Sequence, residues 1–222
     1  LNEQFKQKKI SQTEYDFYTE FLVRVLFSCL IEADRSNSIA FEYPNRSHEL
    51  VFVKPDWQTA IDKIELRYQS FAQNTDLHPI NIQRNFIAQT CLENSKKPQG
   101  TFSLTVPTGG GKTLASLRFA VHHARQHNLD RIIFIIPFTS IIEQNASEVR
   151  KILEDEGFEG SWVLEQHSNL EPEIQTWQSK LISDNWNAAI VFTTMVQFLE
   201  SCFGGGTKGV RRLHQMTNAI IC

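Results

Sequence analysis

The chain has 222 residues, of which 41% are hydrophobic and 21% charged, with a formal net charge of −3. This composition is that of a globular protein of one or two domains, and it excludes a collagen-like, disulfide-framework or wholly disordered chain. No apolar run approaches the roughly 20 residues of a membrane-spanning helix, and no signal peptide leads the chain. We therefore expect a cytoplasmic protein without membrane contact, in which any nucleic-acid binding comes from a local patch.

The four cysteines contain no CxxC pair, which favours buried reduced thiols over a zinc or redox site. The chain begins at Leu1 rather than Met, and it stops at Cys222 inside an apolar run. A domain rarely ends inside a core strand. We therefore expect a fragment of a longer protein.

The first hundred residues have helical patterns. Apolar residues at helical spacing predict a helix within residues 1–40. Turn formers and two prolines in 36–56 predict a connector with a short β-like run at 50–53. Asp56 is a candidate cap for a helix over 57–73, and a further helix is expected over 82–94.

From residue 100 onward, strand patterns alternate with helix patterns. Strands are expected at 101–106, 131–136, 162–166, 188–193 and 218–222, and helices at 112–126, 141–154, 173–182 and 196–202. Such alternation is typical of βαβ units with right-handed crossovers. The sequence therefore predicts an α/β fold with a parallel sheet.

The strongest local signal is a phosphate-loop motif between an expected strand and an expected helix, PTGGGKT at residues 107–113. Glycines let backbone N–H groups surround an anion, and the helix start adds its positive dipole end. We expect Lys112 to reach the β- and γ-phosphates of ATP and the Thr113 hydroxyl to ligate Mg²⁺. The motif departs from GxxxxGK[ST] in having Val106 at the first glycine position. The candidate nucleotide-binding residues are Pro107, Thr108, Gly109, Gly110, Gly111, Lys112, Thr113 and Leu114, with Lys112 and Thr113 as the catalytic ones.

ATP hydrolysis also requires an acidic residue at the end of a neighbouring strand. The pair Asp155–Glu156 follows a helical stretch, and Asp130 precedes its strand, so neither fits. The strand expected at 218–222 is of the right kind but ends with the chain. We therefore expect the acidic box beyond Cys222, and the fragment alone is not expected to be catalytically competent.

Two further strand ends have polar residues suited to a nucleic-acid backbone. Pro137, Thr139, Ser140 and Gln144 follow the strand at 131–136, with Thr139 or Ser140 as the expected helix cap. Thr193 and Thr194 follow the strand at 188–193. Because loops at the carboxyl ends of parallel strands share one edge of a sheet, we expect these residues to lie beside the phosphate loop.

The order and spacing of PTGGGKT, IIPFTSIIEQNA, VLEQHS, IVFTTMVQF and NAIIC resemble the first RecA-like domain of superfamily 2 helicases. More narrowly, they resemble the HD nuclease–helicase effector of type I CRISPR interference, over roughly residues 78–222. This resemblance implies ATP and Mg²⁺ as cofactors, and single-stranded DNA and an RNA-guided surveillance complex as partners. It assigns the DNA-binding role to the segment 137–144 and to Thr193 and Thr194. It also suggests Gln83 as the adenine-reading glutamine, with Gln89 as a competitor.

The segment LFSCLIEAD at residues 26–34 resembles the last helix of the HD nuclease in that family. By this resemblance, Asp34 would be a ligand of a divalent transition metal, although the defining His-Asp pair is not in this chain. The expected domains are the end of the nuclease (1–40), a connector with a helix (41–78) and a truncated helicase domain (79–222).

Two other function classes remain open. One is another P-loop enzyme, although neither an arginine-rich lid of a kinase nor an NKxD element of a GTPase is in this sequence. The other is a nucleotide-dependent interaction module without turnover.

Overall fold

The computed structural model describes residues 10–45, 53–73, 78–155, 162–166 and 186–222. Its sheet contains four parallel strands in the order β2-β3-β1-β4. The strands are β1 (Arg131–Ile135), β2 (Val163–Gln166), β3 (Ile190–Thr193) and β4 (Ala219–Ile221). The predicted α/β class with a RecA-like parallel sheet is therefore confirmed.

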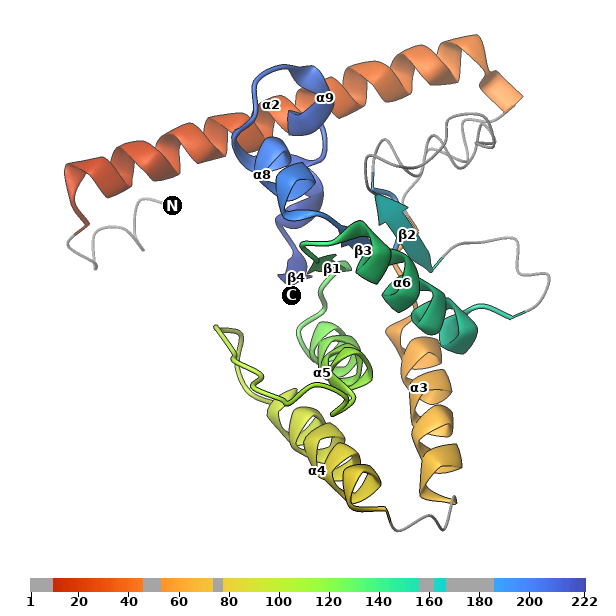
Figure 1. The fold of residues 1–222 in the computed structure, drawn as a ribbon. Helices are drawn as coiled ribbons and strands as arrows, with labels where there is room; N and C mark the ends of the chain where they lie inside the picture. The colour runs from red at the N-terminus through yellow and green to blue at the C-terminus, as the bar shows by residue number, and fades with distance from the viewer. Residues whose placement is uncertain (1–9, 46–52, 74–77, 156–161, 167–185) are drawn as a thin grey trace.

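Three helices cover one face of this sheet (Figure 1). They are α3 (Trp57–Ala72), α5 (Lys112–Gln126) and α6 (Thr139–Leu153). Their apolar side chains form one core with those of β1 and β3, in which Leu117, Ile132, Ile142 and Phe192 are fully buried. A fourth helix, α4 (Pro79–Asn94), packs against α5 on the side away from the sheet. The burial of β1 and β3 explains their continuous apolar sequences.

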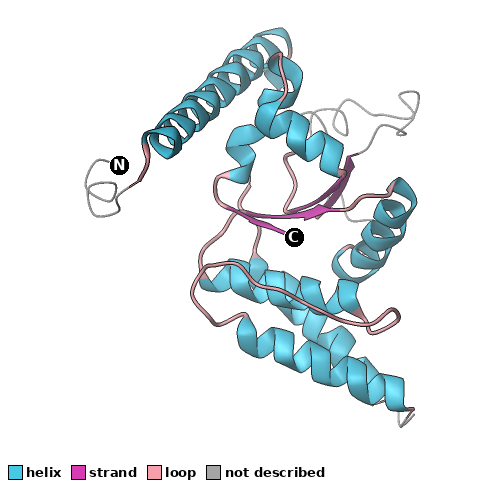
Figure 2. Cartoon of the chain, turned by 60° about the vertical axis from the view of Figure 1, so that its left-hand side comes forward, coloured by secondary structure: helices cyan, strands magenta, loops and turns pink. Residues whose placement is uncertain are grey.

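The opposite face carries a different set of elements (Figure 2). They are α8 (Met195–Phe203), α9 (Thr207–Val210), the short 3₁₀-helix η3 (Leu213–Met216) and the long helix α2 (Gln12–Glu42). Trp186 is fully buried on this side against Ile133 and Val191. The sequence patterns did not predict α9 or η3, because both are too short to show a helical period.

Helix α2 begins with a capping box, in which the Ser11 and Glu14 side chains bond each other's backbone N–H groups. It docks on α8, α9 and η3 through apolar residues that include Ile31, and through Arg24, which donates to the Cys202 and Gly204 carbonyls at 2.8 Å. The expected helix is thus confirmed, but it continues to Glu42. Residues 36–42, expected as connector, are helical.

Helix α3 shows that the expected connector contains part of the main core. Asp56 caps it as predicted, accepting from the Gln58 N–H at 3.0 Å. Trp57 is buried and its indole N–H donates to the Leu129 carbonyl at 2.7 Å. Glu65 pairs with the buried Arg118 of α5 at 2.5 Å.

The pKa of Glu65 reflects this pairing. Burial alone would raise the pKa of this carboxyl, but the hydrogen bonds from Arg118 and His122 outweigh burial and lower the pKa. His122 is half-buried, whereas His123, the next residue of α5, is buried, and its Nδ1 lies 2.8 Å from the Ser95 carbonyl oxygen. Both imidazoles thus act as packing groups between helices.

One predicted strand is wrong. Residues 101–106 form no strand, and their burial does not alternate, because only Val106 is buried. A strand needs a hydrogen-bonding neighbour, and none lies beside this segment among the described residues. Phe102 instead packs on Phe119 of α5, with ring centroids 4.9 Å apart. The apolar side chain of Phe102 therefore contacts a helix rather than a neighbouring strand.

Two other expectations fall in undescribed parts of the chain. The helix at 173–182 lies outside the described residues, and so does the run at 50–53 except for Val53. The remaining predicted helices and strands are confirmed within a few residues of their expected bounds. No helix in the described ranges combines the length and apolar character needed to cross a bilayer.

Candidate functional site

The phosphate-loop segment folds as a tight turn before α5. Gly111 is the N-cap of the helix with φ +77°, a left-handed conformation that favours glycine. At Gly110, an added Cβ would lie 2.4 Å from Val106 Cγ1 and 3.0 Å from the Pro107 carbonyl oxygen. No side chain caps the first turn of α5. The loop therefore leaves the start of α5 open to an anion, which fits the chemistry of a phosphate group.

Lys112 and Thr113 are the first two residues of α5. Lys112 is exposed and forms no ion pair with any described residue, so its charge is available at the loop. The Thr113 hydroxyl donates to Asn145 Oδ1 of α6 at 3.2 Å. Pro107 and Thr108 are also exposed, whereas Leu114 is half-buried. A free ammonium and a hydroxyl beside an anion cradle match what Mg²⁺-bound ATP requires.

Helix α4 supplies a residue that the sequence reasoning missed. Arg84 Nε donates to the Gly109 carbonyl at 2.8 Å, and the Arg84 side chain lies within 4 Å of the Cβ position at Gly111. Ile80 and Ile87 also approach the loop glycines. Residues 80, 84 and 87 form one helical face, so α4 both supports the loop and adds a second cation. The only sequence signal for Arg84 was its place beside Gln83.

The two candidate adenine-reading glutamines lie on different sides of α4. At about 100° per residue, Gln83 is adjacent to the face that contacts the loop, whereas Gln89 is on the opposite face. Both are exposed, and the Gln89 amide donates to Glu93 at 3.2 Å. Helix geometry therefore favours Gln83 of the two.

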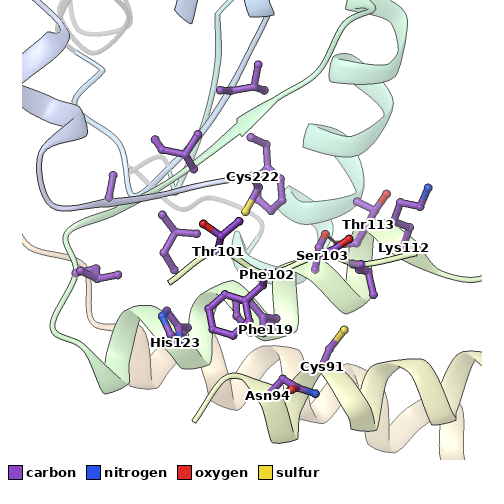
Figure 3. Close-up of a pocket in the computed structure, with 18 of the residues that line it drawn as sticks. Cys91, Asn94, Thr101, Phe102, Ser103, Lys112, Thr113, Phe119, His123 and Cys222 are labelled. Carbon is purple, nitrogen blue, oxygen red and sulfur yellow. Dashed lines mark hydrogen bonds between the residues drawn. The ribbon is translucent and has the colours of Figure 1, made fainter. Parts of the chain in front are cut away.

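A cavity of about 740 Å³ adjoins the loop, between residues 99–104, α5 and the sheet. Figure 3 shows Lys112 and Thr113 on one side of it and His123 on the other. Phe102, Phe119 and His123 give that other side an aromatic lining. The lining also includes Ile135 and Ile136, so the phosphate loop lies at the carboxyl end of β1.

The carboxyl ends of β1 and β3 are neighbours in the sheet. Ile135 is in register with Thr193, and the Ile136 N–H donates to the Thr193 carbonyl at 2.8 Å. Thr193 itself is fully buried, and its hydroxyl donates to the Gln166 carbonyl at 3.1 Å. The Thr193 side chain is therefore not available to a DNA strand. Thr194 is partly exposed and caps α8 by accepting from the Gln197 N–H at 3.2 Å.

The segment after β1 differs from expectation in its cap. Neither Thr139 nor Ser140 caps α6, because the N-cap position is Phe138 and no side chain bonds the first turn. Pro137, Ser140 and Gln144 are exposed, and Thr139 is partly exposed. Phe138 is 62% exposed. Loop residues lack the helical period by which functional faces are found, so no sequence pattern selected this aromatic side chain.

Asp34 does not lie where the resemblance expected it. It is an exposed residue inside α2, which continues for eight more residues, and not the end of a helix. Across the described ranges, no group of three or more His, Cys, Asp or Glu side chains is arranged to hold a metal. The described residues thus do not fit a nuclease metal centre at Asp34.

The four-stranded parallel sheet, with the PTGGGKT segment near the carboxyl end of the inner strand β1, fits an incomplete RecA-like domain. The family described as "Type III restriction enzyme, res subunit" matches residues 61–215, and the chain belongs to this family. The match covers α3 to η3 and indicates an ATP-dependent helicase-like domain of superfamily 2. A comparison with curated proteins found no match.

Proposed function

We propose that this chain is part of an ATP-dependent single-stranded-DNA translocase or helicase, joined to a metal-dependent DNA nuclease that acts in CRISPR antiviral interference. One observation carries the motor assignment. The open start of α5, with Lys112 and Thr113, lies at the same sheet edge as the strand ends before Pro137 and Thr194. A nucleotide and a nucleic-acid strand could thus bind to adjacent parts of one rigid sheet.

In this proposal the nucleotide phosphates bind at residues 107–113. The loop N–H groups and Lys112 hold the β- and γ-phosphates, while Arg84 keeps the loop in place through the Gly109 carbonyl. Mg²⁺, bound with the nucleotide at the Thr113 hydroxyl, would neutralise charge on the phosphates. Gln83 would bond the adenine from the neighbouring face of α4.

The DNA strand is proposed to cross the edge formed by Pro137, Thr139, Ser140, Gln144 and Thr194. Hydroxyls and free helix N–H groups suit phosphate oxygens rather than bases. Binding should therefore depend strongly on salt and weakly on sequence. The family match supports nucleic acid as the ligand.

The nuclease and CRISPR parts of the proposal rest on the resemblance at residues 26–34 and across 78–222. One feature of helix α2 supports the presence of a neighbouring domain. Its residues Val23, Leu26 and Leu30 form an exposed apolar face, which such a domain would cover. We propose that residues 1–40 end the nuclease domain and that 79–222 belong to the motor. Because α3 packs in the motor core, we place it with the motor.

The full-length protein tests the motor assignment by its ATPase rate with and without single-stranded DNA. Stimulation by DNA is the expected result. Turnover that does not respond to DNA would instead favour another P-loop enzyme. Nucleotide binding without turnover would favour an interaction module.

Lys112→Ala should abolish ATP binding, because it removes the free cation at the loop. Equilibrium dialysis with labelled ATP measures this directly. Lys151→Ala is the matched control, because among the described residues Lys151 forms an exposed ion pair with Glu148 at 2.8 Å. The Lys151→Ala variant should bind ATP as the wild type does. ATP affinity retained by Lys112→Ala would contradict the proposed site.

A further inference from the structure

One side chain outside the phosphate loop forms a hydrogen bond with the Thr113 hydroxyl, the group proposed to bind Mg²⁺. Asn145 Oδ1 of α6 accepts the hydrogen bond from Thr113 Oγ1 at 3.2 Å. The two residues come from different βα units and are 32 positions apart in the sequence. Both line the cavity beside the loop. Asn145 is thus the contact through which α6 reaches the proposed nucleotide site.

The position of Asn145 is fixed by the packing of its helix. Ile142 and Ala146, which flank it on α6, are fully buried, and so is Val149 one turn further on. These residues belong to the core shared with α3, α5 and the sheet. The amide oxygen of Asn145 is therefore held by a rigid element and not by a loop, which is what accurate positioning of a ligand group requires.

The chemistry of the two groups determines the direction of this bond. A threonine hydroxyl has one proton to donate and two lone pairs to offer, whereas an amide oxygen can only accept. When the Thr113 hydroxyl donates its hydrogen bond to Asn145, the lone pairs of the hydroxyl oxygen are left free for a cation at the phosphates. The hydroxyl is then oriented before any metal binds, just as residues that hydrogen-bond to metal ligands orient those ligands in other proteins.

We propose that Asn145 is a positioning residue that orients the Thr113 hydroxyl for Mg²⁺ in the nucleotide complex. This inference rests on the proposed ATP site and deepens it. It makes a specific statement about metal dependence: Asn145 contributes to the binding of Mg²⁺–nucleotide and not to that of the metal-free nucleotide, because the phosphates themselves contact the loop and Lys112.

The test compares the affinity of the full-length protein for ATPγS in excess Mg²⁺ and in EDTA, by calorimetry. Asn145→Leu keeps the approximate size of the side chain and removes the acceptor. We expect its affinity for ATPγS in Mg²⁺ to fall about tenfold or more, as when a residue that bonds a metal ligand is removed, and its affinity in EDTA to stay unchanged. Asn145→Asp keeps an acceptor for the Thr113 hydroxyl, so it should still bind ATPγS more tightly in Mg²⁺ than in EDTA, although its added charge changes both affinities.

Ser147→Ala, an exposed change on the same helix, is the control and should bind as the wild type does in both conditions. Equal losses in Mg²⁺ and in EDTA for Asn145→Leu would indicate a structural role and overturn the inference. So would an unchanged affinity in Mg²⁺. If the wild type binds no ATPγS at all, the proposed nucleotide site itself is wrong, an outcome distinct from either of these.

Discussion

At the scale of single residues, the phosphate loop depends on positions that have no room for a side chain. Gly110 is buried beneath Val106 and the Pro107 carbonyl, and Gly111 begins α5 in a left-handed conformation. These constraints explain why glycines fill the loop even though its first consensus position is Val106. That valine is buried and packs over the loop, so its side chain contributes to the shape of the cradle.

Gly110→Ala should therefore damage the loop. The added methyl would lie 2.4 Å from Val106 Cγ1 and 3.0 Å from the Pro107 carbonyl oxygen, so the Val106 side chain or the loop backbone must shift. We expect a loss of about 1–3 kcal/mol in the free energy of unfolding, together with weaker ATP binding. Gly205→Ala is the control, because nothing lies within 4 Å of its Cβ position. Equal stability of the two variants in urea titrations would show that the loop can absorb the methyl group.

At the scale of elements, the starts of α6 and α8 differ although both follow neighbouring strands. Thr194 caps α8, so its hydroxyl has a structural task as well as a proposed role at the DNA edge. Phe138 precedes α6 without capping it and exposes its ring beside Thr139 and Ser140. The Thr194 side chain thus bonds one backbone N–H of the first turn of α8, whereas no side chain bonds the first turn of α6, which is open to a ligand.

Because Thr194 caps α8, removing its hydroxyl affects the stability of the protein as well as any DNA contact. Thr194→Ala should cost about 1 kcal/mol of stability through loss of the cap, besides any loss of DNA affinity. Thr194→Asp keeps a capping oxygen and adds a negative charge, so it should retain stability and ATP binding but bind single-stranded DNA more weakly. Fluorescence anisotropy with a labelled oligonucleotide measures this. Unchanged DNA titration curves for Thr194→Asp would remove Thr194 from the proposed edge.

Phe138, which is 62% exposed beside Thr139, is expected to stack on a base if the DNA strand crosses the proposed edge. Phe138→Ala should weaken single-stranded DNA binding by about 1–3 kcal/mol, as measured for other stacking aromatics, with little change in stability. With an oligonucleotide that contains abasic sites, the variant and the wild type should have the same DNA affinity. Phe41→Ala, at an 87% exposed position of α2, serves as the control. If both variants bind DNA equally well, Phe138 makes no stacking contact.

At the scale of the whole molecule, the buried Ser28 side chain joins α2 to the half-buried His214 of η3. The Ser28 hydroxyl accepts from the His214 backbone N–H at 3.1 Å and lies 2.9 Å from His214 Nδ1. Burial lowers the pKa of His214; the nearby Glu32 carboxylate acts in the opposite direction, and the charge of Arg131 adds to the lowering. A lowered pKa favours the neutral imidazole, whose Nδ1 accepts a hydrogen bond from the Ser28 hydroxyl in the tautomer that carries its proton on Nε2.

This arrangement predicts a pH dependence. Because the folded-state pKa of His214 lies below its ordinary value of 6.5, its contribution to stability is present above that pH and is lost as pH falls through the lowered pKa. His214→Asn retains an acceptor without a titrating group. Urea titrations between pH 8 and pH 5 should show a smaller loss of stability for the variant than for the wild type. Parallel losses would assign the pH dependence to other groups.

Much of the fold could be predicted because its signals are local. A few neighbouring residues suffice to recognise the apolar run of β1, the Asp56 cap of α3 and the PTGGGKT turn before α5. The order of strands and helices then implied a parallel sheet with its loops at one edge. The sequence by itself thus determined the fold class and the place of the phosphate loop.

Other features depended on partners that are distant in the chain. Residues 101–106 have a strand pattern but no neighbouring strand in the described structure, so they pack on α5 instead. Thr193 resembles an exposed loop hydroxyl in sequence, yet pairing with β1 and β2 buries it. Arg84 and Asn145 reach the loop from α4 and α6. Only the tertiary structure decided these points, because burial and hydrogen bonding between distant residues leave no periodic trace in the sequence.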